Sequence, residues 1–478
     1  MMNWYGVLPA LIDKQVWVAG YGRTGKSVIQ ALRRLGAEIV LIDENSNEVP
    51  DNVNRLKAVP QKIDADLIVT SPGWRPDHEL FQAAARASVK VIGDVELAWL
   101  VDQAQAQRNH RPPLKWLAVT GTNGKTTTVE MLESILKAGG ISAVACGNVG
   151  LPVIDAVMAE DNYQALAVEL SSFEIFWAPS LAPYASAVLN ISDDHLDWHG
   201  SIEEYARTKI SLLTHSEIAI YNADDAATVA FLAHEFMGER ISFTLDSPKP
   251  GQLGVVEDLL VDRAFVDNPE DEAAPLASLA DVKPFAPHNV SNALAAAALA
   301  RSVGIGLEAV TSGLSNFKSG AHRIEQIARI NEVDYVDDSK ATNPHAASAS
   351  LRSFSSVVWI AGGLAKGASM DRLIEENMNR LRGVVLIGRD RELIREALMK
   401  FAPLVPVVEV ESSDSTLSKS DQAALLMSKV IRTAGGLANP GDTVLLAPAC
   451  ASMDQFDSYA ERGDLFIQAV HAYEGANP

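Results

Sequence analysis

A glycine-rich segment that runs into a lysine and three threonines carries the strongest chemical signal of the chain. Residues 118–128 read Ala-Val-Thr-Gly-Thr-Asn-Gly-Lys-Thr-Thr-Thr, after an apolar run and before a helix-like one. In that setting, backbone N–H groups and the positive end of a helix dipole face a phosphate. Lys125 adds a mobile cation, and the Thr126 hydroxyl can ligate Mg²⁺. An ordinary glycine-rich turn is the alternative, but it would not need Gly-Lys-Thr at a helix start.

The loop is a variant of the usual P-loop. Its first glycine is Gly121, and Val119 stands where the usual template has a glycine. The lysine and threonine directly after the last glycine keep the phosphate and metal chemistry intact.

Three more residues between 160 and 210 could serve the same chemistry. Glu169 stands near the end of a predicted strand, where an acid can hold Mg²⁺ against a nucleotide. His195 follows another predicted strand among several carboxylates, which suits metal or phosphate chemistry. Lys209 lies one helical turn past Tyr205. The plainer alternatives are a solvated acid, a satisfied polar loop and a surface lysine.

The first hundred residues contain a second glycine turn. Gly20-Tyr21-Gly22-Arg23-Thr24-Gly25 follows an apolar strand and precedes a helix, and the next strand ends at Asp43. The order strand, glycine turn, helix, strand and acid is typical of a dinucleotide-binding fingerprint, and it indicates nucleotide or nucleotide-sugar binding. A Rossmann-like domain whose glycines only permit close packing is the alternative.

Polar turns also follow predicted strands in the last third of the chain. The turns at 337–344, 362–367 and 448–456 bring acids, lysines and hydroxyls to strand ends, and His322-Arg323 lies near the start of this third. In parallel sheets, ligands collect at the carboxyl ends of the strands. Each turn could be a plain loop, although several such turns in one chain favour a binding role.

These residues must be positioned by alternating strands and helices, which predict an α/β protein with parallel pairing throughout. We expect three domains: a Rossmann-like domain at 1–107, a P-loop ATPase-like domain with a mostly parallel sheet at 108–318, and a second Rossmann-like domain at 319–478. The polar segment 103–113 ends in Pro-Pro and is predicted to be a linker. The principal predicted strands are 15–19, 37–42, 65–70, 165–170, 185–191, 333–337, 357–361, 383–387 and 443–447, and the principal helices are 26–35, 201–213 and 289–300.

Composition narrows the class of protein. The 478 residues carry a net charge of −21, which argues against a general nucleic-acid binder. The two cysteines, Cys146 and Cys450, are far apart, so a reducing compartment fits better than a disulfide framework. No apolar run approaches the ~18 residues of a spanning helix. We expect a cytoplasmic monomer that does not insert into membranes.

Taken together, the motifs resemble the Mur ligase family of ATP-dependent amide-forming enzymes of bacterial cell-wall synthesis. The resemblance rests on the phosphate loop, on Glu169-Leu170-Ser171-Ser172-Phe173, and on residues 190–197, 288–292, 322–323, 338–343 and 449–456. The segments 338–343 and 452–456 are similar to the branch that adds D-glutamate. Membership implies transfer of the ATP γ-phosphate to a carboxylate of UDP-N-acetylmuramoyl-L-alanine, then attack of the D-glutamate amine on the acyl phosphate.

The resemblance also implies roles for individual residues. Lys125, Glu169, His195 and Lys209 would be catalytic, with Thr126, Glu169, His195 and a carbamylated Lys209 at two Mg²⁺ ions. ATP would bind at Gly121, Thr122, Asn123, Gly124, Lys125, Thr126, Thr127, Asn289, Asn292, His322, Arg323, Asp338 and Lys340. The UDP-sugar would bind at Arg23, Thr24, Asp43, Ser71, Asn148 and His195, and D-glutamate at Thr342, Lys366, Ser452, Met453 and Tyr459.

The sequence is also compatible with three other functions. A ligase of the same superfamily could add another amino acid or use a folate. A nucleotide-binding switch would keep the phosphate loop but would have no use for the set Glu169, His195 and Lys209. An oxidoreductase built on the first glycine turn would leave residues 106–478 without a purpose.

Overall fold

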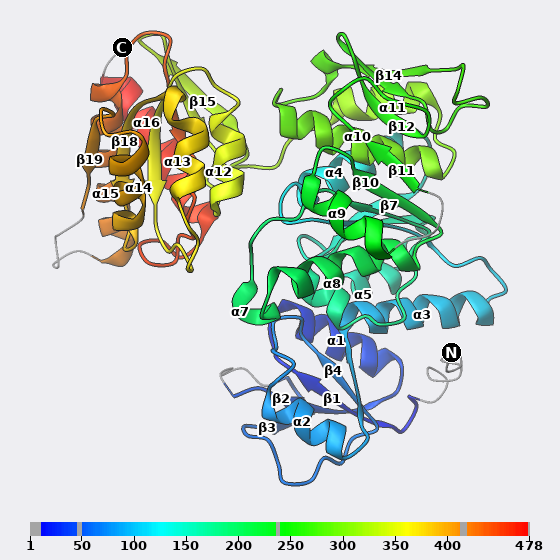
Figure 1. Ribbon diagram of the computed structural model, residues 1–478. Coiled ribbons are helices and arrows are strands. Elements are labelled where there is room, and N and C mark those ends of the chain that lie inside the picture. Colours follow the sequence, from blue (N-terminus) through cyan, green and yellow to red (C-terminus); the bar gives the residue numbers. More distant parts are fainter. Residues whose placement is uncertain (1–10, 45–49, 236–239, 412–417, 477–478) are drawn as a thin grey trace. The chain divides into compact units, whose positions relative to one another are not determined.

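The computed structural model describes residues 11–44, 50–235, 240–411 and 418–476 (Figure 1). They form two compact units. The first contains the chain up to Val282 together with Ser291–Phe317, and the second contains Lys283–Val290 and the chain from Lys318 onward. Among the described helices, none combines the length and the apolar character needed to cross a lipid bilayer.

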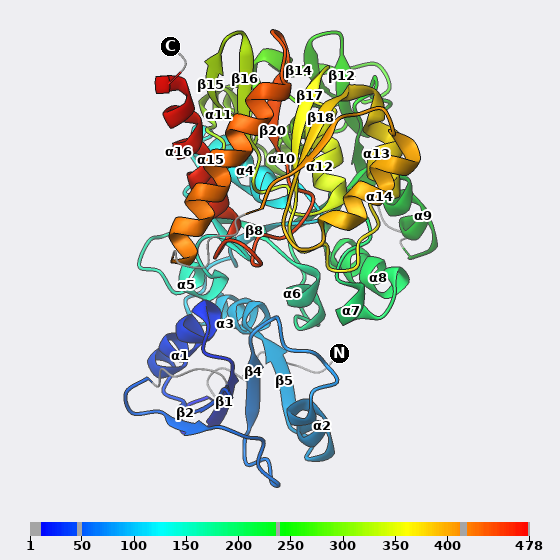
Figure 2. The same ribbon diagram turned by 90° about the vertical axis from the view of Figure 1, so that its left-hand side faces the viewer.

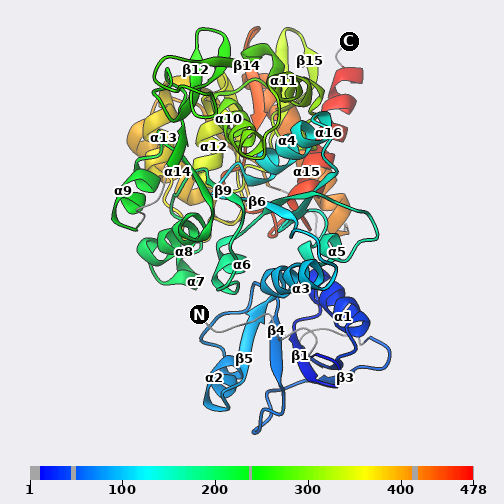
Figure 3. The same cartoon turned by 90° about the vertical axis from the view of Figure 1, so that its right-hand side faces the viewer.

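The first unit begins with a five-stranded parallel sheet of order β3-β2-β1-β4-β5. Side chains alternate between its two faces. One face packs on α1 and α3 and the other on α2 (Figure 3). The elements are β1 Gln15–Ala19, α1 Arg23–Arg34, β2 Glu38–Ile42, β3 Asn54–Leu56, β4 Leu67–Thr70, α2 Glu79–Arg86, β5 Lys90–Gly93 and α3 Asp94–Arg108.

The predicted linker at 103–113 is wrong for its first half, because α3 continues to Arg108. Asp102, on the last turns of this helix, is fully buried and accepts three hydrogen bonds. They come from Arg111 Nη2 at 3.0 Å, Leu114 N at 3.1 Å and Trp116 Nε1 at 3.1 Å. This one carboxylate therefore fastens the Pro-Pro segment to the helix before it and to the strand after it.

Replacing Asp102 by asparagine should lower the free energy of unfolding by about 1–3 kcal/mol, because an amide nitrogen cannot accept from these buried donors. Urea denaturation of the variant measures the loss, with the exposed Asp64→Asn as the matched control. Equal midpoints for the two variants would contradict the proposed role of Asp102.

The first unit continues with a nine-stranded sheet of order β14-β13-β12-β11-β10-β9-β6-β8-β7. Its strands pair in parallel from β7 to β12, and β12, β13 and β14 form an antiparallel edge. The strands are β6 Lys115–Thr120, β7 Ala143–Gly147, β8 Ala165–Glu169, β9 Ala185–Val188, β10 Ile218–Asn222, β11 Arg240–Phe243, β12 Gln252–Val256, β13 Leu259–Asp262 and β14 Ala274–Ser278. The helices are α4 Lys125–Ala138, α5 Val153–Val157, α6 Ser172–Phe176, α7 Leu196–His199, α8 Ile202–His215, α9 Ala226–Glu235, α10 Pro287–Ser302, which runs on from the second unit, and α11 Leu307–Asn316.

The second unit holds a six-stranded sheet of order β15-β16-β20-β17-β18-β19 (Figure 2). Residues of α15 and α16 pack on one face, and residues of α12, α13 and α14 pack on the other. The elements are β15 Glu325–Ile330, β16 Val333–Asp337, α12 Pro344–Leu351, β17 Val357–Gly362, α13 Asp371–Asn377, β18 Leu381–Ile387, α14 Arg391–Phe401, β19 Val407–Glu409, α15 Lys419–Leu437, β20 Thr443–Leu446 and α16 Tyr459–Ala476.

The predicted α/β class is confirmed, but the expectation of parallel pairing throughout is wrong for three strand pairs: β12 with β13, β13 with β14, and β15 with β16. Strands β12 and β13 are joined by two residues, as are β15 and β16. A two-residue connection permits only antiparallel pairing, because a parallel neighbour needs a crossover. In the second hairpin both turn residues, Asn331 and Glu332, have positive φ, the geometry of the tight turns that match strand twist.

Candidate active site

The phosphate loop joins β6 to α4, as the sequence predicts. Gly121 and Gly124 have φ values of +156° and +87°, a region that favours glycine. A Cβ on Gly124 would lie 2.4 Å from Asn292 Oδ1, so the loop passes too close to this predicted ATP residue for a side chain. The Lys125 ammonium donates to the carbonyls of Gly121 at 2.8 Å and Thr122 at 3.0 Å.

The other predicted loop residues are fixed by neighbouring segments. Asn123 N donates to Asn190 Oδ1 at 2.9 Å, and Thr122 Oγ1 lies 3.0 Å from Tyr205 Oη. Thr126 is half-buried and Thr127 is buried. The loop is therefore braced before any ligand arrives, which limits the ordering that phosphate binding requires.

Lys209 is a buried lysine beside this loop, not a surface residue. Only 1% of it is exposed, and its Nζ donates to Thr120 Oγ1 at 3.2 Å and to Gly121 O at 3.0 Å. Lys125 donates to the same Gly121 carbonyl. Burial first, and then the neighbouring Lys125 charge, hold the pKa of Lys209 well below its usual value. An amine in this setting loses its proton more readily than a surface lysine.

Glu169 ends β8 and is 2% exposed. Its Oε1 accepts from Asn148 Nδ2 at 2.9 Å, which joins a predicted UDP-sugar residue to a predicted metal ligand. Its Oε2 is buried and makes no hydrogen bond in the described structure. Buried carboxylate oxygens are costly without a partner. The free oxygen is thus suited to a cation.

His195 directly precedes α7 as its N-cap, in the left-handed region with φ +53°, and its side chain is 44% exposed. Its ring lies 4.7 Å from the Phe173 ring, centroid to centroid. A second histidine that the sequence did not indicate, His199, supports this segment: its Nε2 lies 2.8 Å from Ser172 Oγ, and its ring stacks on Phe173. Burial lowers the pKa of His199 to about 4, so this ring is neutral and supports the His195 segment through packing.

The predicted UDP-sugar residues of the first sheet gather at its first glycine turn. Asp43 Oδ2 accepts from Tyr21 N at 2.7 Å, and a Cβ on Gly20 would lie 2.9 Å from Ser71 Oγ. The Ser71 hydroxyl is buried and has no hydrogen-bond partner in the described structure. Arg23 is exposed and Thr24 half-buried on the first turn of α1.

Close packing explains only part of this turn. A Cβ on Gly25 would lie 2.0 Å from Gly20 O, whereas Gly22 has open space around it. The open glycine and the unpaired Ser71 hydroxyl are better explained by a ligand than by packing alone.

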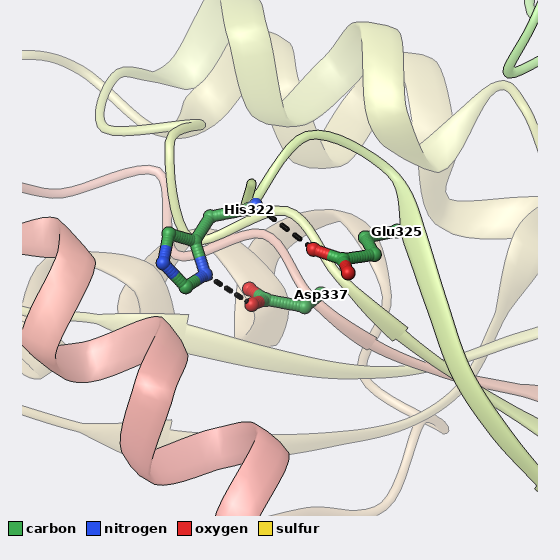
Figure 4. Close-up of side chains that lie close together, drawn as sticks. All are labelled: His322, Glu325 and Asp337. Atoms are coloured by element: carbon green, nitrogen blue, oxygen red, sulfur yellow. Dashed lines mark hydrogen bonds and ion pairs between the residues drawn. The ribbon is translucent and has the colours of Figure 1, made fainter. Parts of the chain in front are cut away.

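In the second unit, His322 and Asp337 form a buried pair. His322 Nδ1 lies 2.6 Å from Asp337 Oδ2, and His322 N donates to Glu325 Oε2 at 3.2 Å (Figure 4). This hydrogen bond to Asp337 raises the pKa of His322. The three residues are close enough to hold a metal, but Asp337 Oδ2 and Glu325 Oε2 already accept these hydrogen bonds. We interpret Asp337 and Glu325 as acids that orient His322. The sequence places Asp337 in the polar turn at 337–344 but indicates no separate role for it.

Further predicted ATP residues also belong to the second unit. Asp338 is buried, is hydrogen-bonded by Ser350 Oγ and lies within electrostatic reach of Arg323. Lys340 Nζ lies 4.0 Å from the centre of the Tyr459 ring, a cation–π contact between a predicted ATP residue and a predicted D-glutamate residue. Asn289, on α10, is buried and donates to Pro284 O at 2.9 Å.

The other predicted D-glutamate residues follow β16, β17 and β20, at one edge of the sheet. Leu364 and Ala451 exchange backbone hydrogen bonds of 2.8 and 3.0 Å, so the loop of Lys366 is joined to that of Ser452. Thr342 is half-buried, Ser452 is buried, and Lys366 and Met453 are exposed. The binding roles of all these residues remain predictions.

Two family models match the chain: the Mur ligase middle domain over residues 119–300 and the Mur ligase glutamate ligase domain over residues 322–450. The chain is 51% identical to the UDP-N-acetylmuramoylalanine--D-glutamate ligase of Thermobifida fusca, over 97% of this chain and 100% of that protein.

Solved structures show the same fold at low sequence identity. A pseudomurein peptide ligase type C from Methanothermus fervidus matches with a TM-score of 0.59 and 18% identity, over 96% of this chain and 100% of its own. The MurF ligase from Thermotoga maritima in complex with ADP matches with a TM-score of 0.56 and 18% identity, over 99% and 100%. By its sequence similarity and its fold, the chain belongs to the Mur ligase family.

Proposed function

We propose that this protein is the ATP-dependent ligase that joins D-glutamate to UDP-N-acetylmuramoyl-L-alanine, releasing ADP and phosphate, in peptidoglycan precursor synthesis. The observation that carries the proposal is the 51% identity over nearly the full length to a D-glutamate ligase. The geometry supports the reaction class, because a braced phosphate loop lies beside a buried lysine and a buried carboxylate. A cytoplasmic location and a monomeric state remain predictions.

The reaction has two steps that these residues can assist. The alanyl carboxylate attacks the ATP γ-phosphorus, and ADP leaves with the electrons of the broken P–O bond. The D-glutamate amine then attacks the acyl carbon, loses a proton and expels inorganic phosphate. Phosphoryl transfer of this kind depends mostly on positioning and charge neutralisation. Lys125 would turn from the loop carbonyls to the outer phosphates, and the loop N–H groups would orient them.

We propose two Mg²⁺ ions, held by Thr126, Glu169, His195 and Lys209. The buried, unpaired Oε2 of Glu169 fits a cation, and hydroxyl and carboxylate oxygens are ligands that Mg²⁺ prefers. When bound, the metal would neutralise charge on the transferring phosphoryl group.

Lys209 fits a metal site only after modification, because an ammonium would repel the ion. We propose that its amine adds CO₂: a C–N bond forms, one proton leaves to solvent, and the product is a carbamate anion. The low pKa supports this reaction, since only the neutral amine is nucleophilic. Thr120 Oγ1 and Gly121 O now accept from Nζ, and the single N–H of the carbamate would keep one of these two hydrogen bonds.

The residues proposed to bind the UDP-sugar and those proposed to bind D-glutamate belong to different sheets. The first glycine turn with Thr24, Asp43 and Ser71 would bind the UDP-sugar, and Asn148 would link it to Glu169. Lys366, Thr342 and Ser452 would bind the two carboxylates of D-glutamate, which need cations and hydroxyl donors.

The test is phosphate release by the purified protein with ATP, Mg²⁺, UDP-N-acetylmuramoyl-L-alanine and D-glutamate. We expect release only when all four are present, and L-glutamate, glycine and L-lysine should not replace D-glutamate. Release with another amino acid would reassign the ligase within its superfamily. Nucleotide binding without acceptor-dependent release would favour a switch and would refute the proposal.

A further inference from the structure

Arg462, on α16, is a fully buried arginine that was not identified from the sequence. None of its surface is exposed, and the side-chain hydrogen bonds that it makes among the described residues all go to neutral oxygens. Nε donates to Ser339 Oγ at 3.0 Å, Nη2 to Ser339 O at 2.8 Å and Nη1 to Cys450 O at 3.2 Å. Burying a guanidinium without a bonded carboxylate is costly. If this position only filled space, an apolar side chain would give a more stable protein.

The partners of Arg462 lie in two loops that matter for the proposed reaction. Ser339 belongs to the loop after β16, which carries Lys340 and Thr342, and Cys450 belongs to the loop after β20, which carries Ser452. Strands β16 and β20 are parallel neighbours, so both loops leave the same edge of the sheet. The planar fork of an arginine can hold two such backbones at a fixed separation, which a lysine cannot.

Other contacts extend this network around Arg462. Ser339 Oγ donates to Tyr459 O at 2.7 Å, and Ser339 N donates to Asp337 Oδ1 at 2.9 Å. The other carboxylate oxygen of Asp337 holds His322. The guanidinium is thus bonded to a serine that is itself tied to the first residue of α16 and to the acid of the His322 pair.

We propose that Arg462 is a positioning residue for the amino-acid site: it fixes the loops after β16 and β20 so that Thr342 and Ser452 can bind the D-glutamate carboxylates together. The inference rests on the proposed function. Misplacing binding groups by about 1 Å can cost ~100-fold in catalytic efficiency. Loss of Arg462 should therefore weaken D-glutamate binding more than UDP-substrate binding, whose predicted residues belong to the first unit.

The test compares steady-state kinetics of Arg462→Met, Arg462→Lys and Ser339→Ala with the wild type. For Arg462→Met we expect KM for D-glutamate to rise about 10- to 100-fold, with KM for the UDP-substrate within twofold of wild type. Arg462→Lys should keep the charge but lose the fork, and should recover only part of the affinity. Ser339→Ala should shift KM in the same direction by a smaller factor. Arg432→Met, an exposed arginine on α15, is the matched control and should leave all constants unchanged.

A role in positioning also predicts chemical rescue. Guanidinium ion at millimolar concentration should lower KM for D-glutamate in Arg462→Ala and have no such effect on Arg432→Met. Circular dichroism and melting curves establish which variants fold. The inference is overturned if folded Arg462→Met keeps KM for D-glutamate within twofold, or if every KM rises by the same factor. If Arg462→Met does not fold, an unchanged KM for D-glutamate in Ser339→Ala overturns it. Absence of D-glutamate turnover in the wild type would instead refute the proposed function.

Discussion

Replacing Lys209 by methionine is expected to reduce phosphate release about 100- to 1,000-fold while making the protein more stable. The loss of activity follows from the proposed metal site, because a thioether can form neither a carbamate nor an oxygen ligand for Mg²⁺. Removal of a group that stabilises charge in the transition state costs ~10²–10³-fold or more. Lys209 is 1% exposed and donates to two oxygens of the loop region, so the substitution does not change the protein surface.

The gain in stability follows from the pKa of Lys209, which is lower in the folded state than its usual value. A lysine with a lowered folded-state pKa binds its proton more weakly after folding. Its contribution to stability therefore falls as the pH drops below the pKa of the unfolded chain. At pH 7, methionine removes that penalty and fills similar space.

The measurement combines phosphate release with thermal unfolding at pH 7. Lys137→Met is the matched control, because Lys137 is exposed on α4 and forms a surface ion pair with Glu133. We expect this control to keep full activity and to show no gain in stability. A folded Lys209→Met enzyme with more than a tenth of wild-type activity would remove Lys209 from the catalytic set.

Intact mass spectrometry addresses the modification directly. Addition of CO₂ to an amine increases the mass by about 44 Da, and this adduct should be absent from Lys209→Met. Because carbamates revert in acid, the spectrum must be recorded near neutral pH. Wild-type activity that survives complete removal of CO₂ at pH 6 would contradict the carbamate.

The sequence predicts local structure best where a backbone conformation requires a particular residue type. Gly121 and Gly124 mark the phosphate loop because both have positive φ. A Cβ on Gly124 would also lie too close to Asn292. The predicted strands 15–19 and 333–337 agree with the structure, because short stretches rich in valine and aromatic residues that end at a glycine or acidic turn favour strands. Local signals of this kind require no knowledge of distant residues.

The parts that were missed depend on contacts between distant residues. Nothing near Asp102 in the sequence shows that Arg111 and Trp116 will both donate to it, and so the composition of 103–113 predicts a linker.

Arg462 lies on a polar stretch of α16, and its burial follows only from its contacts with the loops of Ser339 and Cys450. Lys209 could be suspected from its spacing to Tyr205, because residues four apart share a helix face. Its burial beside Gly121 still required the fold.

Replacing Asp338 by asparagine is expected to stabilise the protein at pH 8 and to weaken its use of ATP. Burial raises the pKa of Asp338 to about 7, from 3.8 for an ordinary aspartate, and the Ser350 hydroxyl bond only partly offsets that effect. A carboxyl group with a raised folded-state pKa stabilises the fold below its unfolded pKa, and this contribution is lost as the pH rises through the folded value. A tenfold change in proton affinity is worth about 1.4 kcal/mol, so the ionised group costs up to about 4 kcal/mol above pH 7.

The stability difference between Asp338→Asn and wild type should therefore be near zero at pH 4 and grow through pH 7 to a plateau. Urea denaturation across this range measures it, with the exposed Glu375→Gln as the control that should stay flat. At pH 8 the same variant should show a higher KM for ATP, because an amide accepts nucleotide hydroxyls less strongly than a carboxylate. A role in ATP binding would explain why the chain keeps a buried acid that destabilises the fold at pH 8. A stability difference that does not change with pH would show that Asp338 keeps an ordinary pKa through contacts with Arg323.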